Sequence, residues 1–383
     1  MTQSESRTGL RSHRVIFVDL GRALAVTFML YGHTVSALLA PEYQRGRWFD
    51  VWQFQRGLTS SLFLLLAGFA FSVATGRNWA AHLRWSPALL KRVRRFGLFI
   101  VLGYALHFPV GRLVDLPSAS DERWQSFLIV DVLQLIGVTF ILVQLLVLVT
   151  RTRRALTFAT LTLAIAAMLA TPAIWRVDWA QRLPLALAAY LSPATGSLFP
   201  LFPWVAFVLL GVGLGQLYGR WGAADLGRYA NLALLLPGAV LVGSSFVAST
   251  AAGAAGIFGS GQGTSVPAQV LVRSGSCLIL LAAIAHLSRR ITRLPHVFGA
   301  VAQESLLIYF VHLCIVYGSV WNRGLAGVYG LTLTPLQTVL VVVLLILSMV
   351  ALARYWNWWK HIRPTAARWT MYAVWGFLLF QLR

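Results

Sequence analysis

The stretch that decides the fold is Arg14-Val-Ile-Phe-Val-Asp-Leu-Gly-Arg-Ala-Leu-Ala-Val-Thr-Phe-Met-Leu-Tyr-Gly-His33. From residue 16 to residue 40 the chain is long and apolar enough to cross a bilayer as one helix. Yet Asp19, Arg22 and His33 lie within this span. On a helix, Arg22 and His33 fall about 20° apart and Asp19 about 40° from His33, so the three share one stripe. Because ionisable groups are costly in hydrocarbon, the stripe indicates either a buried Asp19–Arg22 ion pair or a polar site inside the membrane.

The composition places the whole chain in a membrane. Of 383 residues, 58% are hydrophobic and 11% are charged, and long apolar runs recur along the sequence. This pattern excludes a soluble globular protein and predicts an all-α, polytopic membrane helix bundle. We expect a single domain over residues 1–383 that begins with a cytoplasmic tail at 1–13. Both cysteines, Cys277 and Cys314, lie in apolar segments, so neither a disulfide framework nor a metal site is predicted.

About ten to eleven transmembrane helices are expected. They lie near residues 16–40, 58–75, 93–110, 126–149, 155–172, 199–219, 231–250, 270–288, 297–319, 336–353 and 369–382. The last segment is short for a span, so a tilted or interfacial helix is an alternative. The uncharged, Gly- and Ala-rich stretch 250–267 is typical of an external loop over a site or of a plain linker.

The net charge of +21 orients the protein in the membrane. When alternate loops are assigned to alternate sides, one side collects 21 basic residues and the other 9. The positive-inside rule then places the N-terminus in the cytoplasm, and loops 41–57, 110–125, 173–198, 251–269 and 320–335 outside. The predicted partner of this charge is the lipid bilayer and not nucleic acid. A multi-pass protein of a bacterial inner membrane is the expected localisation.

Polar residues on separate predicted helices reach the outer third of the membrane. These residues are His33, His107, Asp131, Gln134 and His312, and Ser305 and Tyr309 share a helix face with His312. Several helices that bring polar groups to one depth are typical of a buried catalytic or binding centre. The alternative for any one of them is a hydrogen-bonded core residue.

A second polar layer lies at the predicted cytoplasmic face. It contains Asp19, Arg22, the basic run 91–95 and Glu304. The basic run is explained by anchoring to the inner leaflet or by a phosphate site, since guanidinium groups bind phosphate in a bidentate manner. An acyl-coenzyme A donor would bring several phosphates from the cytoplasm. Arg92 and Arg95 share a helix face, which suits one ligand.

Several segments together resemble the membrane-bound acyltransferases, which comprise acyltransferase family three and the related bacterial heparan-α-glucosaminide N-acetyltransferase-like proteins. The first segments are Asp19-Leu-Gly-Arg-Ala-Leu-Ala-Val, the histidine His33 and Ser61-Leu-Phe-Leu-Leu-Leu-Ala-Gly-Phe-Ala-Phe71. Three later ones look more like the second group: Asp131-Val-Leu-Gln-Leu-Ile-Gly137, Leu198-Phe-Pro-Leu-Phe-Pro-Trp204 and Ser305-Leu-Leu-Ile-Tyr-Phe-Val-His312. The resemblance covers residues 14–359, and its specificity comes from the order of the segments.

The resemblance implies an acetyltransferase. Its donor would be acetyl-CoA or another acyl-CoA from the cytoplasm, and its acceptor a hydroxyl or amine of a sugar or glycan on the outer side. His33 matches the catalytic histidine of acyltransferase family three, and Arg92 to Arg95 match the donor-phosphate region. The lysosomal sugar N-acetyltransferase instead has its key histidine in the loop after the first helix. Loop 41–57 contains no histidine here, so His33 would have to serve.

The expected roles follow from this reading. Arg22, Arg92, Arg95 and Asp19 would contact the donor; His33, Asp131 and His312 would be catalytic; Gln134, Tyr309, Ser305 and Glu304 would contact the acceptor. His33 is expected to act as general base with Asp131 orienting its imidazole. Gln134 or Tyr309 would stabilise the oxyanion. A transporter or flippase for a small polar or lipid-linked solute is the alternative, because transport paths also carry intramembrane polar residues. A purely structural scaffold does not explain the polar stripe.

Overall fold

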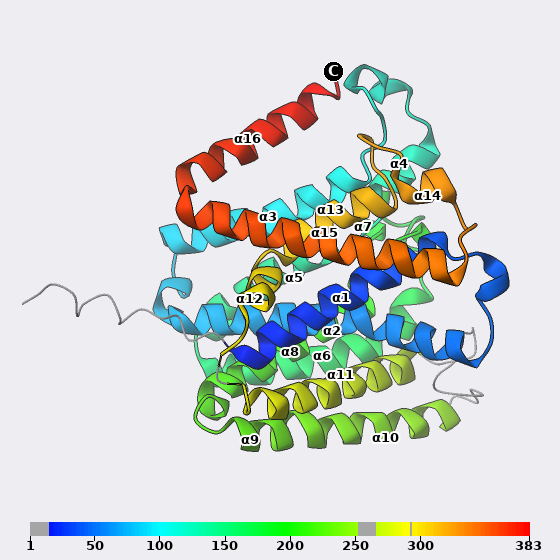
Figure 1. Ribbon diagram of the computed structural model, residues 1–383. Coiled ribbons are helices and arrows are strands. Elements are labelled where there is room, and N and C mark those ends of the chain that lie inside the picture. The colour runs from blue at the N-terminus through cyan, green and yellow to red at the C-terminus, as the bar shows by residue number, and fades with distance from the viewer. Residues whose placement is uncertain (1–14, 252–265, 292) are drawn as a thin grey trace, which may run out of the picture.

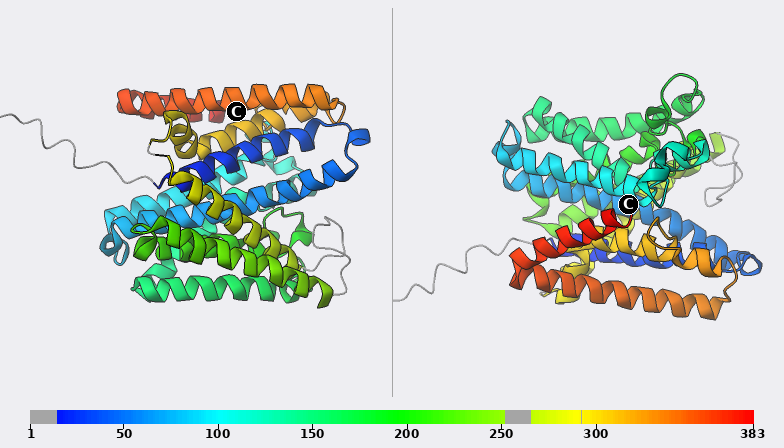
Figure 2. Two further views of the ribbon diagram at one scale, coloured as in Figure 1. Left: turned by 60° about the horizontal axis from the view of Figure 1, so that its bottom comes forward. Right: turned by 90° about the horizontal axis from the view of Figure 1, so that it is seen from above.

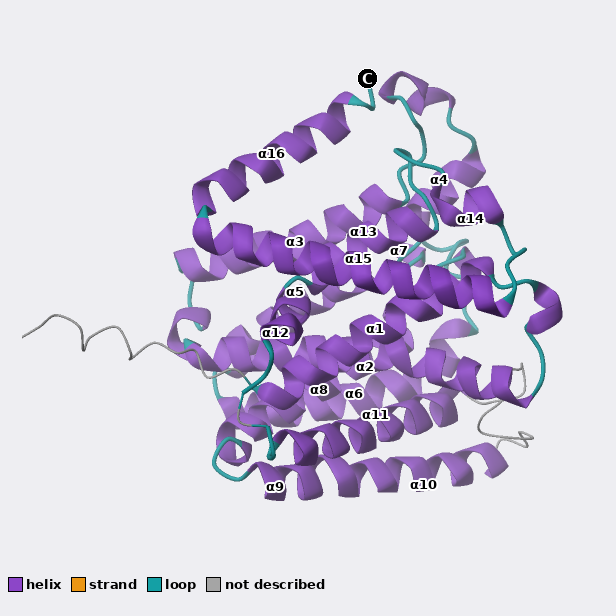
Figure 3. Ribbon diagram, in the orientation of Figure 1, coloured by secondary structure: helices purple, strands orange, loops and turns teal. Residues whose placement is uncertain are grey.

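The computed structural model describes residues 15–251, 266–291 and 293–383. Over these residues helices are joined by loops, and β-type pairing is confined to two isolated bridges (Figure 3). The predicted all-α helix bundle is therefore confirmed. The predicted tail at 1–13 and most of the predicted loop at 250–267 lie outside the described residues.

The helices pack side by side; most of the long ones run roughly along a common direction, whereas α12 is turned across its neighbours (Figures 1 and 2). They are α1 (Ile16–Leu38), α2 (Arg47–Arg77), α3 (Pro87–Leu106), α4 (Asp121–Leu128), α5 (Val132–Thr150), α6 (Arg153–Trp175), α7 (Leu185–Ala188), α8 (Leu201–Leu217), α9 (Leu226–Tyr229), α10 (Leu236–Ala251), α11 (Val266–Ser288), α12 (His296–Gln303), α13 (Ser305–Val316), α14 (Gly324–Tyr329), α15 (Pro335–Ile362) and α16 (Pro364–Phe380). Two π-helical stretches, Tyr218–Gly222 and Ala230–Leu235, extend α8 and lead into α10.

Seven helices of the described chain are long and apolar enough to cross a membrane. They are Arg47–Arg77, Val132–Thr150, Arg153–Trp175, Leu201–Gly222, Leu226–Ser249, Val266–Ser288 and Pro335–Ile362. The pair α12 and α13, bent by 72°, makes an eighth if it counts as one span. Polar residues interrupt α1 and α3, and α16 has 17 residues, so these three predicted spans are not in the set. A multi-pass membrane protein is shown, and the total of ten to eleven spans stays a prediction.

Helix α1 occupies the middle of the bundle. It packs against α2, α11, α12, α13 and α15, which come from both halves of the sequence (Figure 1). Buried side chains follow its whole length, from Phe17 to Leu38. Because α1 is surrounded, its polar stripe faces other helices of the protein, as intramembrane ionisable residues generally do.

Glycines bring α2 and α8 unusually close together. A methyl group added to Gly211 would collide with the carbonyl oxygen of Leu65, and one added to Gly68 would collide with that of Val208. Small residues at such crossings let membrane helices pack backbone to backbone. This contact fixes the position of α2 relative to α8. The other side of α2 faces α1 and the cavities described below.

Several predicted boundaries were wrong, among them the end of the helix predicted at 336–353, which extends to Ile362. Helix α2 begins at Arg47, so most of the loop predicted at 41–57 is helical. The predicted helix 126–149 is interrupted between α4 and α5, because Asp131 and Gln134 form a capping box that starts α5. The predicted helix 297–319 is divided at Glu304 into α12 and α13. The last two breaks fall at polar residues that bind backbone or neighbouring helices.

Candidate active site

A basic cavity of about 610 Å³ lies beside the first turns of α1. Its polar lining consists of Asp19, Arg22, Arg77, Arg92, Arg95, Gln303, Ser305 and Tyr309. The rest of the lining is largely apolar and includes six phenylalanines from α2, α3 and α5. Four of the five charged lining residues are arginines, so the cavity is suited to an anionic ligand with apolar parts. All four residues expected to contact the donor line this cavity.

Arg92 is held in a fixed position at the edge of the basic cavity. Its Nη2 donates to the carbonyl oxygen of Phe71 at 3.0 Å, and its guanidinium carbon lies 4.0 Å from the centroid of the Phe71 ring. Its Nη1 lies 3.3 Å from Nε2 of His82. Burial and the neighbouring Arg92 charge lower the pKa of His82, which favours its neutral form. Arg92 therefore presents a pre-ordered cation to the cavity.

A second cavity, the histidine cavity, has a volume of about 490 Å³ and lies beside the last turns of α1. Its polar lining consists of His33, Thr59, Ser60, His107, Asp131, Tyr309 and Tyr317. Most of these residues lie in α1, α2 and α13. His107 and Tyr317 directly follow α3 and α13, and Asp131 directly precedes α5. The structure thus brings His33, His107 and Asp131 to one chamber.

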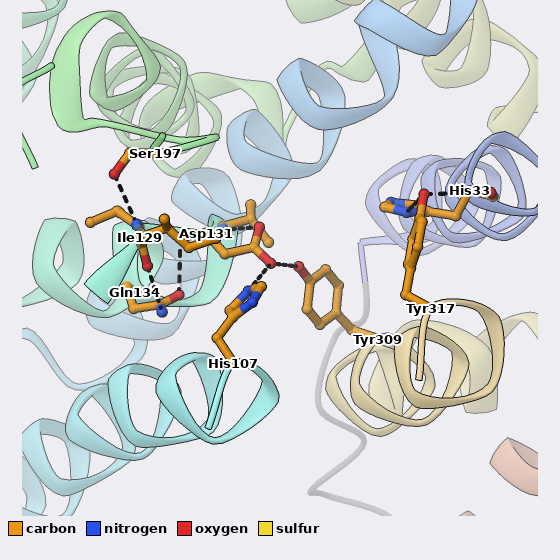
Figure 4. Close-up of polar contacts among 10 residues, drawn as sticks. His33, His107, Ile129, Asp131, Gln134, Ser197, Tyr309 and Tyr317 are labelled. Carbon is orange, nitrogen blue, oxygen red and sulfur yellow. Dashed lines mark hydrogen bonds and ion pairs between the residues drawn. The ribbon is translucent and has the colours of Figure 1, made fainter. Parts of the chain in front are cut away.

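Asp131 is the most strongly bound polar residue of the histidine cavity (Figure 4). Its Oδ1 accepts from the backbone N–H of Val132 at 2.6 Å, since Asp131 caps α5. Its Oδ2 lies 3.5 Å from Nε2 of His107 and accepts from the hydroxyl of Tyr309 at 3.3 Å. The N-terminus of α5 also favours the carboxylate form of Asp131. These contacts make Asp131 a fixed negative charge in the chamber wall.

The expected hydrogen bond between Asp131 and His33 is not formed. His33 Nδ1 lies 3.2 Å from the hydroxyl of Tyr317, and the two rings meet edge to face (Figure 4). Asp131 is already engaged by His107 and Tyr309, so Tyr317 takes the orienting position. The sequence did not predict a role for Tyr317. It directly follows the last turn of α13, where a single tyrosine has no periodic spacing that would mark it as a site residue.

Two residues expected to contact the acceptor have structural contacts instead. Gln134 is fully buried, and its Oε1 accepts from the backbone N–H of Asp131 at 3.2 Å as part of the α5 cap. Glu304 forms an ion pair with Lys360 of α15 at 2.6 Å and accepts from Asn357 at 3.0 Å. Neither side chain lines either cavity. Capping of α5 explains why Gln134 is buried, and the contacts with α15 explain why Glu304 is buried.

His312 and Ser305 do not line the histidine cavity. His312 is fully buried; its Nδ1 lies 2.8 Å from the carbonyl oxygen of Ile308, and its ring is 5.3 Å from that of His33. Its ring contacts the ring of His33 but does not line the histidine cavity. Ser305 lines the basic cavity. Among the described residues, no three His, Cys, Asp or Glu side chains are grouped to hold a metal ion.

Phe63 and Tyr309 line both cavities and form an aromatic wall between them. Their ring centroids are 6.4 Å apart and their planes are inclined by 30°. Tyr309 is buried and bound to Asp131, whereas Phe63 is only partly buried. No sequence pattern marks Phe63, which looks like any other apolar residue of α2. The wall is the one place where the linings of these two cavities meet.

The fold and these two chambers define an integral membrane protein with a polar, histidine-containing centre inside its helix bundle. The family model of the heparan-alpha-glucosaminide N-acetyltransferase catalytic domain matches residues 14–245, which is more than half of the chain. The chain belongs to this family, and it is in general terms a membrane acetyltransferase. No curated protein matches it in sequence. The resemblance found in the sequence motifs is confirmed, although Tyr309 and Tyr317 lie beyond the matched residues.

Proposed function

We propose that the protein transfers an acetyl group from acetyl-CoA in the basic cavity to a sugar hydroxyl or amine in the histidine cavity. The observation that carries this proposal is the pair of chambers that meet at Phe63 and Tyr309. One chamber suits a polyphosphate donor and the other holds a candidate base. A reaction between two substrates that arrive from opposite sides of the membrane needs two chambers that meet inside the protein.

The arginines of the basic cavity support donor binding. Arg92 is pre-ordered by Phe71 and His82, and Arg77 and Arg95 line the same space. Guanidinium groups bind phosphate oxygens in pairs of parallel hydrogen bonds. The excess of basic residues at this end of the bundle supports its assignment to the cytoplasmic side, where acyl-CoA is made. The apolar remainder of the cavity suits the pantetheine arm.

His33 is the proposed general base. With Nδ1 beside the Tyr317 hydroxyl, Nε2 is available to take the proton of the acceptor hydroxyl or amine as its oxygen or nitrogen attacks the acetyl carbon. The thioester C–S bond breaks, and the coenzyme A thiolate leaves and is protonated. A neutral imidazole is suited to this role because its unprotonated ring nitrogen can accept a proton from the acceptor.

The test is acetyl transfer by purified protein from radiolabelled acetyl-CoA to glucosamine or methyl glucoside. We expect wild-type protein to label an acceptor, and His33→Ala to lose at least about 100-fold in rate, the lower range for general-base catalysis. His296→Ala is the matched control, because His296 is exposed and lines neither cavity. Undiminished transfer by His33→Ala would refute the assigned role. Absence of any coenzyme A binding would favour a transporter.

A further inference from the structure

The short helix α13 begins inside the bundle, at the edge of the basic cavity. The chain breaks at Glu304, where α12 and α13 meet at a bend of 72°. Because of this bend, α12 does not continue along the axis of α13. Ser305 and Leu306, the first two residues of α13, line the basic cavity. The N-terminal end of α13 therefore borders a space that can hold a ligand.

The first N–H groups of α13 receive no cap from the residue that precedes them. The first turn of any α-helix leaves N–H groups without an intrahelical acceptor. Glu304 occupies the capping position, but its side chain makes no capping hydrogen bond and is bound to Lys360 and Asn357. Inside a membrane protein, an uncapped helix start is tolerated where it lines a polar cavity or meets a ligand. The start of α13 thus provides hydrogen-bond donors beside the basic cavity.

The Ser305 side chain independently indicates a ligand at the same place. Ser305 is only 6% exposed, and it lines the basic cavity. Within the part of the chain that the structure describes, its hydroxyl has no hydrogen-bond partner. A buried hydroxyl without a partner costs stability, and a ligand that accepts its hydrogen bond removes this cost.

Two helices that run in the same direction define the level of Ser305 along the bundle. Both α1 and α13 begin at the basic cavity and lead to the histidine cavity. The rings of His33 and His312 contact each other near the second end. At 1.5 Å per residue, Ser305 lies about 10 Å before His312, whereas Arg22 lies about 16 Å before His33. Ser305 is therefore between Arg22 and the histidines.

This level corresponds to one part of a bound coenzyme A. In the proposed reaction, the phosphates lie at Arg92 and Arg95 and the thioester lies at the aromatic wall. Tyr309 of that wall is only one helical turn from Ser305. A phosphate at Ser305 would leave a single helical turn for the whole pantetheine arm. The arm itself contains two amide groups, whose carbonyl oxygens accept hydrogen bonds from hydroxyl and N–H groups.

We propose that Ser305 and the first N–H groups of α13 bind an amide carbonyl of the donor's pantetheine arm. The Ser305 hydroxyl and a backbone N–H would both donate to that carbonyl oxygen. This subsite rests on the proposed function, because it requires coenzyme A in the basic cavity. It assigns Ser305 to the donor, whereas the sequence assigned Ser305 to the acceptor. Its effect is to hold the arm extended, with the thioester at the aromatic wall.

The test compares two ligands by calorimetric titration: coenzyme A, and adenosine 3′-phosphate 5′-diphosphate, which is the same nucleotide without the pantetheine arm. We expect Ser305→Ala to weaken coenzyme A binding by about 2- to 12-fold, the equivalent of one neutral hydrogen bond, and to leave nucleotide binding unchanged. Arg92→Gln should weaken both. Ser348→Ala makes the same change at an exposed position of α15 that lines neither cavity, and it should weaken neither. Ser305→Thr keeps the hydroxyl and should restore coenzyme A binding.

The outcomes separate this subsite from the donor site as a whole. Equal weakening of both ligands by Ser305→Ala would assign a phosphate to this position and overturn the pantetheine subsite. An unchanged coenzyme A affinity in Ser305→Ala would also overturn it, while the proposed donor site would stand. Unchanged nucleotide binding by the same variant shows that it is folded. If wild type binds neither ligand, the proposed function fails and the subsite fails with it.

Discussion

Replacing Arg92 by glutamine should weaken coenzyme A binding by about 10- to 150-fold. A guanidinium group has five N–H donors. In the structure one is used by the Phe71 carbonyl and one faces His82, which leaves three for a ligand in the basic cavity. The glutamine side chain would still fill part of the space, but the positive charge would be lost. Loss of a single hydrogen bond between charged groups costs about 1.5–3 kcal/mol, which gives the stated range in Kd.

The measurement is a calorimetric titration of purified protein with coenzyme A. The control is Arg94→Gln, which removes the same charge from the same helix, at an exposed position that lines neither cavity. Because both variants change the net charge equally, long-range electrostatics affect them alike, and only direct contact distinguishes them. Equal weakening by both variants, or an Arg92→Gln Kd within about twofold of wild type, would refute the donor assignment.

Three further predictions concern other parts of the molecule. Phe63→Ala removes half of the aromatic wall, so transfer of butyryl relative to acetyl groups should rise in a competition assay; an unchanged ratio would contradict the wall's role. Gly211→Ala should lower thermal stability, because overpacking costs about 1–3 kcal/mol, whereas Gly243→Ala meets nothing within 4 Å and should not; equal midpoints would argue against the close crossing. The pKa of His82 is lowered by burial and Arg92, so the unfolded chain takes up this proton first as pH falls below about 6.5, and stability decreases. His82→Gln should therefore lose less thermal stability between pH 7 and pH 5 than wild type, and an identical loss would contradict that assignment.

Hydrophobic length and charge were sufficient to predict the helix bundle and which polar residues lie near the same end of it. His33, His107 and Asp131 share a chamber because each lies near the same end of its helix. Depth follows from counting residues at about 1.5 Å each, and needs no tertiary information. The basic cavity was predictable for the same reason, since Arg22 and Arg92 both lie near the basic end of the bundle.

The direction in which a side chain points could not be predicted in this way. Gln134 has the same depth as Asp131, but it is used to cap α5, and the break that requires a cap is invisible in an apolar run. Glu304 pairs with Lys360, which is 56 residues away in sequence. Which partner a buried charge selects depends on how α12 and α15 pack, and no local pattern records that packing.

The aromatic wall has a consequence for the energetics of the cell membrane. Phe63 and Tyr309 separate two polar chambers that lie toward opposite ends of the bundle. A continuous file of water through a protein conducts protons, and a cell that stores energy as a proton gradient would lose it through every copy of such an enzyme. The rings of Phe63 and Tyr309 stand at the boundary between the two chambers, where such a file of water would have to pass. In the proposed reaction, only a neutral acyl group would have to pass this wall, whereas protons and coenzyme A would not.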